Sequence, residues 1–333
     1  MSTERMTLRG SPVVAAPGKI FLIGEYAVLD GAPAVVAAVS VSAVGQFVPG
    51  IEAESPFVGE SVQAALTGLG DRARALPAGS VLIDSSAFQR HGKKLGVGSS
   101  AAVAAASVAA VMELAGLPVA ANRDMCFALA ERAHRAAQGG AGSGADVAAA
   151  VHGGIIQYRR PPRGYPIIEK TRLPTALRLV VFAEGTPSST VDLIRAVRGY
   201  ADTNPEGYAQ VMQPLREQAE SFAEALGAGN VEGLLSAARN YLDGLTDLGG
   251  RVGVPIVTER FQMAGDLAIN LGGVAKPSGA GGGDVGVALF ADDAAARDFT
   301  SRLAHLGLEV VDLGLDSPGV HRRQPGHLSG QPS

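Results

Sequence analysis

A glycine- and serine-rich stretch preceded by two lysines has the residue types best suited to hold an anion. It spans 93–111 and reads KKLGVGSSAAVAAASVAAV. The Ala and Val run contains no helix breaker, so we expect a buried helix there, with Ser99 and Ser100 where an N-cap belongs. A helix N-terminus favours an anion, and Gly96 and Gly98 would let a phosphate approach the backbone. The stretch therefore predicts a phosphate-binding loop.

The alternative is an ordinary loop that caps an Ala-rich core helix. The stretch is not a Walker loop, because no Gly-Lys-Ser/Thr closes it. Two further glycine-rich stretches carry a lysine each: Ala16-Pro17-Gly18-Lys19 leading to Gly24-Glu25-Tyr26, and the run from Lys276 to Asp284.

Lysine is scarce in this chain and concentrated near glycine. Of 28 basic residues five are lysines, and four of these lie in or beside the glycine-rich stretches. The lysine ammonium is a compact point charge on a flexible stem, which suits a site that gathers several phosphates onto short loops.

Composition excludes several classes of protein. The 333 residues are 47% hydrophobic, enough for a large core and for two domains. No run of eighteen apolar residues occurs, and MSTERMTLRG lacks a signal-peptide core, so we expect a soluble, cytoplasmic protein with no membrane partner. The single cysteine, Cys126, excludes an intramolecular disulfide framework and a cysteine zinc cluster. A net charge of -4 with few aromatics gives no support for nucleic-acid binding.

The hydrophobic pattern changes near Pro174, where we place a domain boundary between 1–174 and 175–316. Before it we expect short strands at 13–16 and 20–23. After it the pattern predicts helices on a small sheet: strands at 177–182, 285–290 and 308–313, and helices at 189–202, 205–226, 231–248, 256–271 and 293–306. The Pro/Gly/Ser/His-rich segment 317–333 is expected to be a disordered tail.

Taken in order, the three glycine-rich stretches resemble the GHMP small-molecule kinase superfamily. Its motifs are matched by PGK…GE, GVGSSAA and KPSGAGGG, over residues 16 to about 290. Within the superfamily, three features are similar to the phosphomevalonate kinases: Lys94 two residues before the first loop glycine, the pair Gly283-Asp284, and the run 134–154.

The resemblance implies an α+β, two-domain fold: an N-terminal α/β domain with a left-handed crossover, a C-terminal ferredoxin-like domain, and an active site in the cleft between them. It implies ATP- and Mg²⁺-dependent phosphorylation of 5-phosphomevalonate to 5-diphosphomevalonate in isoprenoid synthesis, by a monomer or homodimer. One alternative is a mevalonate kinase or another GHMP kinase. The other is a non-catalytic, metabolite-binding module of the same fold, which the intact lysines, carboxylates and glycine loops argue against.

The resemblance also implies residue roles. Lys19 would lie beside the transferred phosphoryl group, Asp146 would contact the acceptor and Lys19, and Ser100 and Glu131 would bind magnesium. The nucleotide phosphates would be held within loop 94–102, by Lys94, Gly96, Val97, Gly98, Ser99, Ser100 and Ala101. The substrates would contact Lys19, Tyr26, Lys94, Ser143, Gly144, Asp146, Ser189, Lys276, Ser278, Gly279, Ala280 and Gly281.

Structural roles remain open for four of these residues: a surface position on a loop for Lys19, a solvated helix position for Glu131, and helix caps for Asp146 and Ser189. The acceptor chemistry separates Lys19 from Asp146. A phosphomonoester has a second pKa of about 6 and is ionised near pH 7, so it needs cations more than a base. We therefore expect Lys19, Lys94 and magnesium to contribute most, with Asp146 orienting the acceptor.

Overall fold

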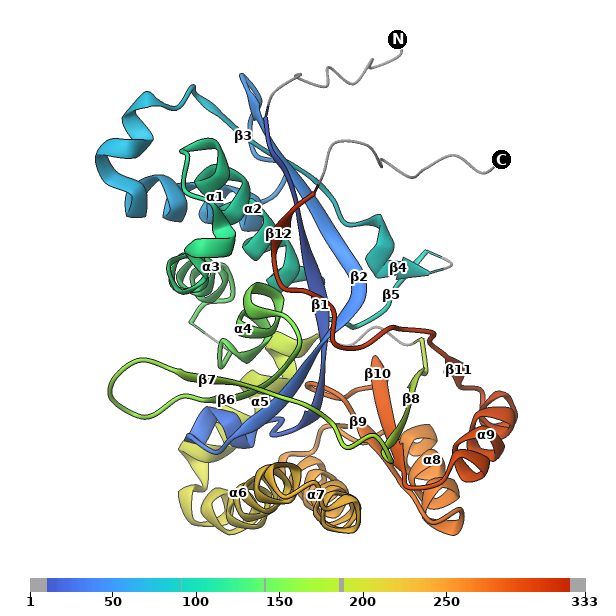
Figure 1. The fold of residues 1–333 in the computed structure, drawn as a ribbon. Coiled ribbons are helices and arrows are strands. Elements are labelled where there is room, and N and C mark those ends of the chain that lie inside the picture. Colours follow the sequence, from blue (N-terminus) through green and yellow to red (C-terminus); the bar gives the residue numbers. More distant parts are fainter. Residues whose placement is uncertain (1–10, 91, 141, 186–188, 324–333) are drawn as a thin grey trace.

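The computed structural model describes residues 11–90, 92–140, 142–185 and 189–323. Its first unit is built on a six-stranded antiparallel sheet (Figure 1). The strands run in the order β12-β1-β2-β6-β7, and β3 also pairs with β2. Their bounds are β1 Val13–Ile23, β2 Ala34–Pro49, β3 Gly79–Asp84, β6 Ile155–Arg159, β7 Ile167–Thr171 and β12 His321–Arg322.

Four helices lie together beside this sheet in Figure 1: α1 Pro56–Leu69, α2 Ser99–Leu114, α3 Arg123–Ala137 and α4 Ala145–His152. Helix α2 is at the centre of the layer and is buried from Ala104 to Met112. Its Ala and Val side chains are small, which lets α2 pack against β1, β2 and three helices at once. The expected buried helix is confirmed.

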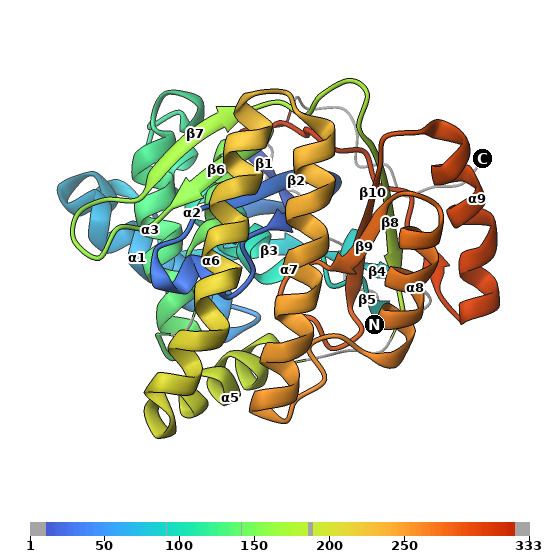
Figure 2. The same cartoon turned by 90° about the horizontal axis from the view of Figure 1, so that it is seen from below.

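The second unit contains a four-stranded antiparallel sheet in the order β11-β8-β10-β9. These strands are β8 Arg178–Ala183, β9 Val274–Pro277, β10 Val285–Phe290 and β11 Glu309–Val310. The helices are α5 Thr190–Thr203, α6 Pro205–Gly227, α7 Val231–Val252, α8 Glu259–Asn270 and α9 Asp293–Arg302. Helices α6 and α7 run side by side across the molecule in Figure 2. Phe182, Phe261, Phe290 and Phe299 form an aromatic core beneath α8 and α9.

The expected α+β class is confirmed, and the helices begin and end close to their predicted positions. The chain passes from one sheet to the other between Thr171 and Arg178, around the boundary interpreted at Pro174. A short hairpin, β4 Gln89–Arg90 and β5 Lys93–Lys94, precedes α2. No helix in the described ranges is both long and apolar enough to span a membrane.

The first strand differs from the prediction of two short strands. Strand β1 is continuous through Pro17, with a shift of its register against β2 between Pro17 and Gly18. Because proline has no N–H to donate to a ladder, strands accommodate it at such an irregularity. The bulge also brings Lys19 to the level of the phosphate loop, where its N–H donates to the Val97 carbonyl (2.8 Å).

The prediction of a disordered tail is wrong for residues 317–323. Strand β12 pairs with β1, Val320 is fully buried, and Arg123 Nη1 donates to the Val320 carbonyl (3.1 Å). These contacts come from residues some 200 positions or more away, so the polar composition of the segment could not indicate them. The rest of the predicted tail, 324–333, lies outside the described residues.

Candidate active site

The three glycine-rich stretches meet around a cavity of about 330 Å³ between the two units. The cavity is also lined by the start of α4 and by the start of α5. It brings together most of the predicted site residues: Lys19, Tyr26, Lys94, Gly96, Gly98, Ser99, Ser100, Ser143, Asp146, Ser189, Ser278, Gly279, Ala280 and Gly281.

Five predicted site residues do not line this cavity: Val97, Ala101, Gly144, Glu131 and Lys276. Val97 and Ala101 are buried members of the phosphate loop, and Gly144 is the N-cap of α4. Several cavity residues had no predicted role, among them Phe21, Glu25, Gln138 and Asp284. Glu25 and Asp284 belong to the glycine-rich stretches themselves, which was a usable signal. Phe21 and Gln138 gave none.

The phosphate loop begins its helix differently from the prediction. The N-cap of α2 is Gly98 in the left-handed conformation (φ +80°), with no side-chain cap, so the expectation of serine N-caps is wrong. A Cβ at Gly98 would lie 2.9 Å from Lys19 Cγ and Cε. Glycine is therefore required both for the backbone turn and for the approach of Lys19. Ser99 and Ser100 fall in the first turn, where N–H groups have no intrahelical acceptor.

Lys19 is the cation at the meeting point of the three stretches. Its side chain is 8% exposed, and its amine lies 5.1 Å from the Phe21 ring centroid. A Cβ on Gly279 would be 3.5 Å from the Lys19 Nζ. The amine therefore faces the third glycine-rich stretch, Ser278–Gly281, called the third loop below. Burial lowers the pKa of Lys19, while the nearby carboxylates of Asp146, Glu25 and Asp284 oppose that shift.

The lowered pKa of Lys19 predicts an alkaline limit to activity. Below that pKa the amine is charged and can attract phosphates; above it the charge is lost. We expect kcat/KM to fall on the alkaline side with an apparent pKa below the ordinary 10.5 of a lysine. The measurement is kcat/KM against pH. The Lys19→Arg variant is the control, because its guanidinium stays charged. An alkaline fall in kcat/KM that persists unchanged in this variant would contradict its assignment to Lys19.

Asp146 and Ser100 both line the cavity and share one neighbour, His134. Asp146 lies in the first turn of α4, where its Oδ1 accepts from the Val147 N–H (2.9 Å), so it contacts the helix start without being the N-cap. His134 on α3 places its Nε2 3.0 Å from Ser100 Oγ and 3.7 Å from Asp146 Oδ2. The Nε2 of His134 thus lies near one oxygen of α2 and one oxygen of α4.

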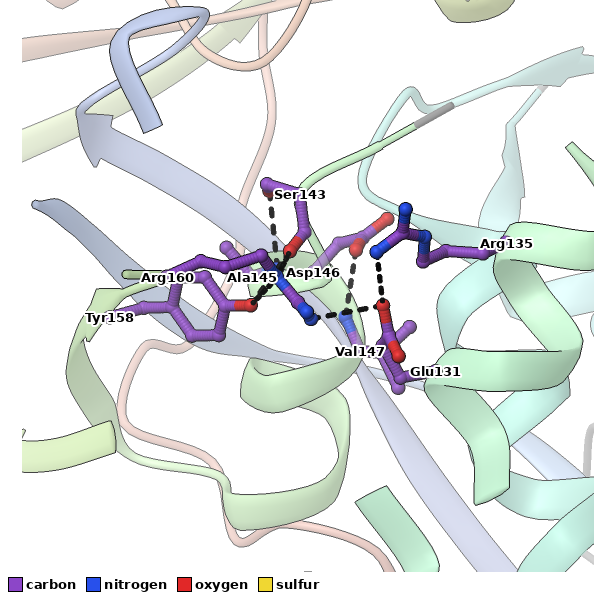
Figure 3. A network of polar contacts seen from close by, with 8 residues as sticks. All are labelled: Glu131, Arg135, Ser143, Ala145, Asp146, Val147, Tyr158 and Arg160. Atoms are coloured by element: carbon purple, nitrogen blue, oxygen red, sulfur yellow. Dashed lines mark hydrogen bonds and ion pairs between the residues drawn. The ribbon is translucent and has the colours of Figure 1, made fainter. Parts of the chain in front are cut away.

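Glu131 lies between the guanidinium groups of Arg135 and Arg160 (Figure 3). Its Oε1 pairs with Arg160 Nη2 (2.9 Å) and Arg135 Nη1 (3.4 Å). Arg160 Nε and the Tyr158 hydroxyl both donate to the Ser143 carbonyl, at 2.9 and 2.7 Å. Two guanidinium groups therefore hold the Glu131 carboxylate, which does not line the cavity, and the network braces the turn before Asp146. The expected contact of Glu131 with a metal stays a prediction.

Lys276 also departs from its expected role. It is fully buried, and its Nζ donates to Glu25 Oε1 and to the Pro277 carbonyl (3.0 Å). The ammonium lies 5.8 Å from the Tyr241 ring centroid. This placement corrects the expected substrate contact: Lys276 joins β9 to the loop after β1 and leaves no group facing the cavity.

The third loop is tied to β1 and to the turn after it by two further hydrogen bonds. The Tyr26 hydroxyl donates to the Ala280 carbonyl (2.6 Å), and the Phe21 N–H donates to Ser278 Oγ (2.8 Å). Ser189 is the N-cap of α5, where its Oγ accepts from the Asp192 N–H (3.2 Å), and it lines the cavity as well. The capping interpretation of Ser189 is thus confirmed, while a substrate contact remains a prediction.

Comparison with known proteins gives a consistent set of similarities. Residues 68–154 match the model of the GHMP kinases N terminal domain. The chain is 30% identical to the phosphomevalonate kinase of Streptomyces sp. strain CL190, over 90% of this chain and 94% of that protein. It is 28% identical to the mevalonate kinase of Aeropyrum pernix, over 92% and 100%.

Among solved structures, the fold is similar to that of Streptococcus pneumoniae phosphomevalonate kinase in complex with phosphomevalonate and AMPPNP. The TM-score is 0.79 and the identity 22%, over 91% of this chain and 99% of that one. At this identity the likeness concerns the fold. The side chains described above carry the argument about the site.

Proposed function

Because this chain belongs to the phosphomevalonate kinases of the GHMP kinase family, we propose that it transfers the γ-phosphoryl group of ATP to 5-phosphomevalonate. The products are 5-diphosphomevalonate and ADP. The observation that carries the proposal is the buried Lys19 amine, held between the phosphate loop, the third loop and Asp146. The Streptococcus pneumoniae relative was solved with both phosphomevalonate and an ATP analogue, which supports the same pair of substrates here.

The reaction needs two anions to approach each other. An oxygen of the acceptor phosphate bonds to the γ-phosphorus, the bond from that phosphorus to the β–γ bridging oxygen breaks, and the electron pair leaves with ADP. Catalysis of this step is mainly positioning and charge stabilisation. Lys19 supplies a desolvated positive charge beside the transferred group, and the first turn of α2 supplies backbone N–H donors for the nucleotide phosphates.

The acceptor phosphate requires no base, since its second pKa is about 6. Asp146 is therefore assigned to orient the acceptor and Lys19. Lys94 is assigned to the acceptor's own phosphate, because it is exposed on β5 at the edge of the cavity. Ser189 and the third loop, Ser278–Gly281, complete the proposed substrate contacts.

Ser100 and Asp146 fit a magnesium ion brought by the nucleotide. Both oxygens lie beside His134 Nε2, at 3.0 and 3.7 Å, and both residues line the cavity. Magnesium commonly takes one or two protein oxygens together with phosphate oxygens and waters. When bound, magnesium neutralises charge on the β- and γ-phosphate oxygens. The described residues contain no group of three or more His, Cys, Asp or Glu that could hold a metal. Phosphate oxygens and waters would complete the magnesium shell.

The direct test is ADP release from ATP and Mg²⁺, with mevalonate and 5-phosphomevalonate in separate reactions. We expect turnover with the phosphorylated acceptor alone. Turnover with mevalonate alone would keep the cavity and its phosphate loop but would overturn the acceptor assignment. ATP binding without turnover of either acceptor would favour another substrate or a non-catalytic role.

The acceptor assignment also predicts the effect of Lys94→Met. Removing a cation that binds the acceptor's phosphate in ground and transition states alike should raise KM for 5-phosphomevalonate by about tenfold or more, with a smaller change in kcat. Lys93→Met is the matched control, because this neighbouring lysine is exposed but does not line the cavity. Steady-state kinetics at saturating ATP distinguish them. Equal effects of both substitutions would show a general loss of surface charge instead.

A further inference from the structure

His134 is a buried imidazole aimed at the wall of the active site. It belongs to α3, is 2% exposed, and packs against the Phe57 ring with 5.9 Å between ring centroids. Its Nε2 lies near three polar groups: Ser100 Oγ at 3.0 Å, Gln138 Nε2 at 3.2 Å and Asp146 Oδ2 at 3.7 Å. Burial of a polar ring in this way is favourable only when its nitrogen is satisfied.

The interaction with Ser100 has a geometric consequence. A serine hydroxyl can rotate freely about its Cβ–Oγ bond, and near a helix terminus it can also turn back to the backbone. A hydrogen bond to His134 removes that freedom, whichever of the two atoms carries the hydrogen. The remaining lone pairs of Ser100 Oγ then keep a fixed direction relative to the cavity and to Asp146.

We propose that His134 is a positioning residue for the magnesium–nucleotide complex and acts through the Ser100 hydroxyl. This inference rests on the proposed function, because it assumes that Ser100 contacts the magnesium of a bound nucleotide. His134 is not itself a ligand in this scheme, since magnesium prefers oxygen donors and the imidazole nitrogen is engaged by Ser100. Residues that orient metal ligands in this way commonly change metal affinity or activity by about 10- to 100-fold.

The experiment measures binding of AMPPNP by calorimetry, with and without Mg²⁺ and without any acceptor. In the wild type we expect Mg²⁺ to strengthen binding. In His134→Leu the gain in AMPPNP affinity from Mg²⁺ should be about tenfold smaller than in the wild type. The affinity for AMPPNP without Mg²⁺ should stay within about twofold of the wild-type value. The matched control is His152→Leu. His152 is half-buried, lies outside the cavity lining, and its Nε2 has no hydrogen-bond partner among the described residues. This variant should behave as the wild type.

Two comparisons test whether His134 acts through Ser100. The double variant Ser100→Ala/His134→Leu should lose no more of the Mg²⁺ effect than Ser100→Ala alone, because the two residues form one unit. His134→Gln, whose amide reaches the position of Nε2, should restore most of the effect. Additive losses in the double variant, or an equal fall in Mg²⁺-free affinity, would assign His134 a purely structural role and overturn the inference.

A folding defect is recognised from thermal unfolding. Should His134→Leu fail to fold, His134→Asn replaces it in the experiment, because it keeps a polar side chain on α3 but withdraws it from Ser100. It should show the same tenfold loss of the Mg²⁺ effect; wild-type behaviour would overturn the inference.

The acceptor assignment is judged separately. A wild type that turns over 5-phosphomevalonate while His134→Leu binds Mg²⁺ and AMPPNP normally defeats this inference alone. Loss of the Mg²⁺ effect in a protein inactive on both acceptors supports the inference and defeats the acceptor assignment.

Discussion

Replacing Lys19 with methionine is expected to lower kcat about a thousandfold, with a much smaller change in the affinity for nucleotide. Methionine is of similar length and fills the space beside Phe21, but it carries no charge. The amine of Lys19 lies where the phosphate loop, the third loop and Asp146 converge, and the residue is buried. A charge there acts on the transferred group at low effective dielectric, where its contribution is largest.

The informative comparison is Asp146→Asn, which we expect to cost far less than Lys19→Met. The asparagine keeps the size of the side chain and one oxygen, so it can still accept from the Val147 N–H and orient the acceptor. The kcat of each variant is measured with 5-phosphomevalonate, after circular dichroism has established folding. Comparable, severe losses from both substitutions would indicate an acceptor hydroxyl that needs a base, and would count against a phosphate acceptor.

The sequence predicted those parts of the site that depend on local chemistry. Glycines, serines and lysines in three short stretches indicated phosphate binding, and the structure brings these stretches to one cavity. Helical periodicity likewise located α5 to α9 within a few residues, because an amphipathic stripe is a property of the segment itself. Lys19, Ser100 and Asp146 were assigned to the site from the family resemblance, and all three line the cavity, although the N-cap of α2 was assigned to a serine instead of Gly98.

The remaining features depend on partners distant in sequence. Nothing near Glu131 in the chain indicates that Arg160 would hold its carboxylate, and nothing near His134 indicates its contact with Ser100. The segment 317–323 is polar in composition, yet it is ordered by β1 and Arg123. In each case the decisive interaction joins separate elements, so spacing along the chain could not specify it.

The ion pair of Glu25 and Lys276 is the strongest example, and its loss should have the largest effect on stability. The two side chains are 1% and 0% exposed, and they join the loop after β1 in the first unit to β9 in the second. The Tyr241 hydroxyl donates to the Glu25 carbonyl (2.5 Å) from α7. Burial lowers the pKa of Lys276 and outweighs the opposing effect of Glu25.

Glu25→Gln should therefore lower the free energy of unfolding by about 3–5 kcal/mol, because Lys276 is left as a buried charge without its counterion. Urea denaturation measures the change. The double variant Glu25→Gln/Lys276→Met should recover a large part of it, since no unpaired charge then remains. Asp247→Asn is the matched control: its pair with Arg251 is about half exposed, and we expect a loss below about 1 kcal/mol.

The pH dependence of this loss separates a charge effect from a packing effect. In Glu25→Gln the pKa of Lys276 in the folded state should fall further below its ordinary 10.5, because the opposing carboxylate is gone. The unfolded chain then binds more protons than the folded one between the two pKa values, so stability rises with pH across that window. The difference in the free energy of unfolding between the wild type and Glu25→Gln should consequently become smaller as the pH is raised toward 10. A deficit that stays constant with pH, or a double variant as unstable as Glu25→Gln, would show that Glu25 acts through packing alone and not as the counterion that allows Lys276 to join the two units.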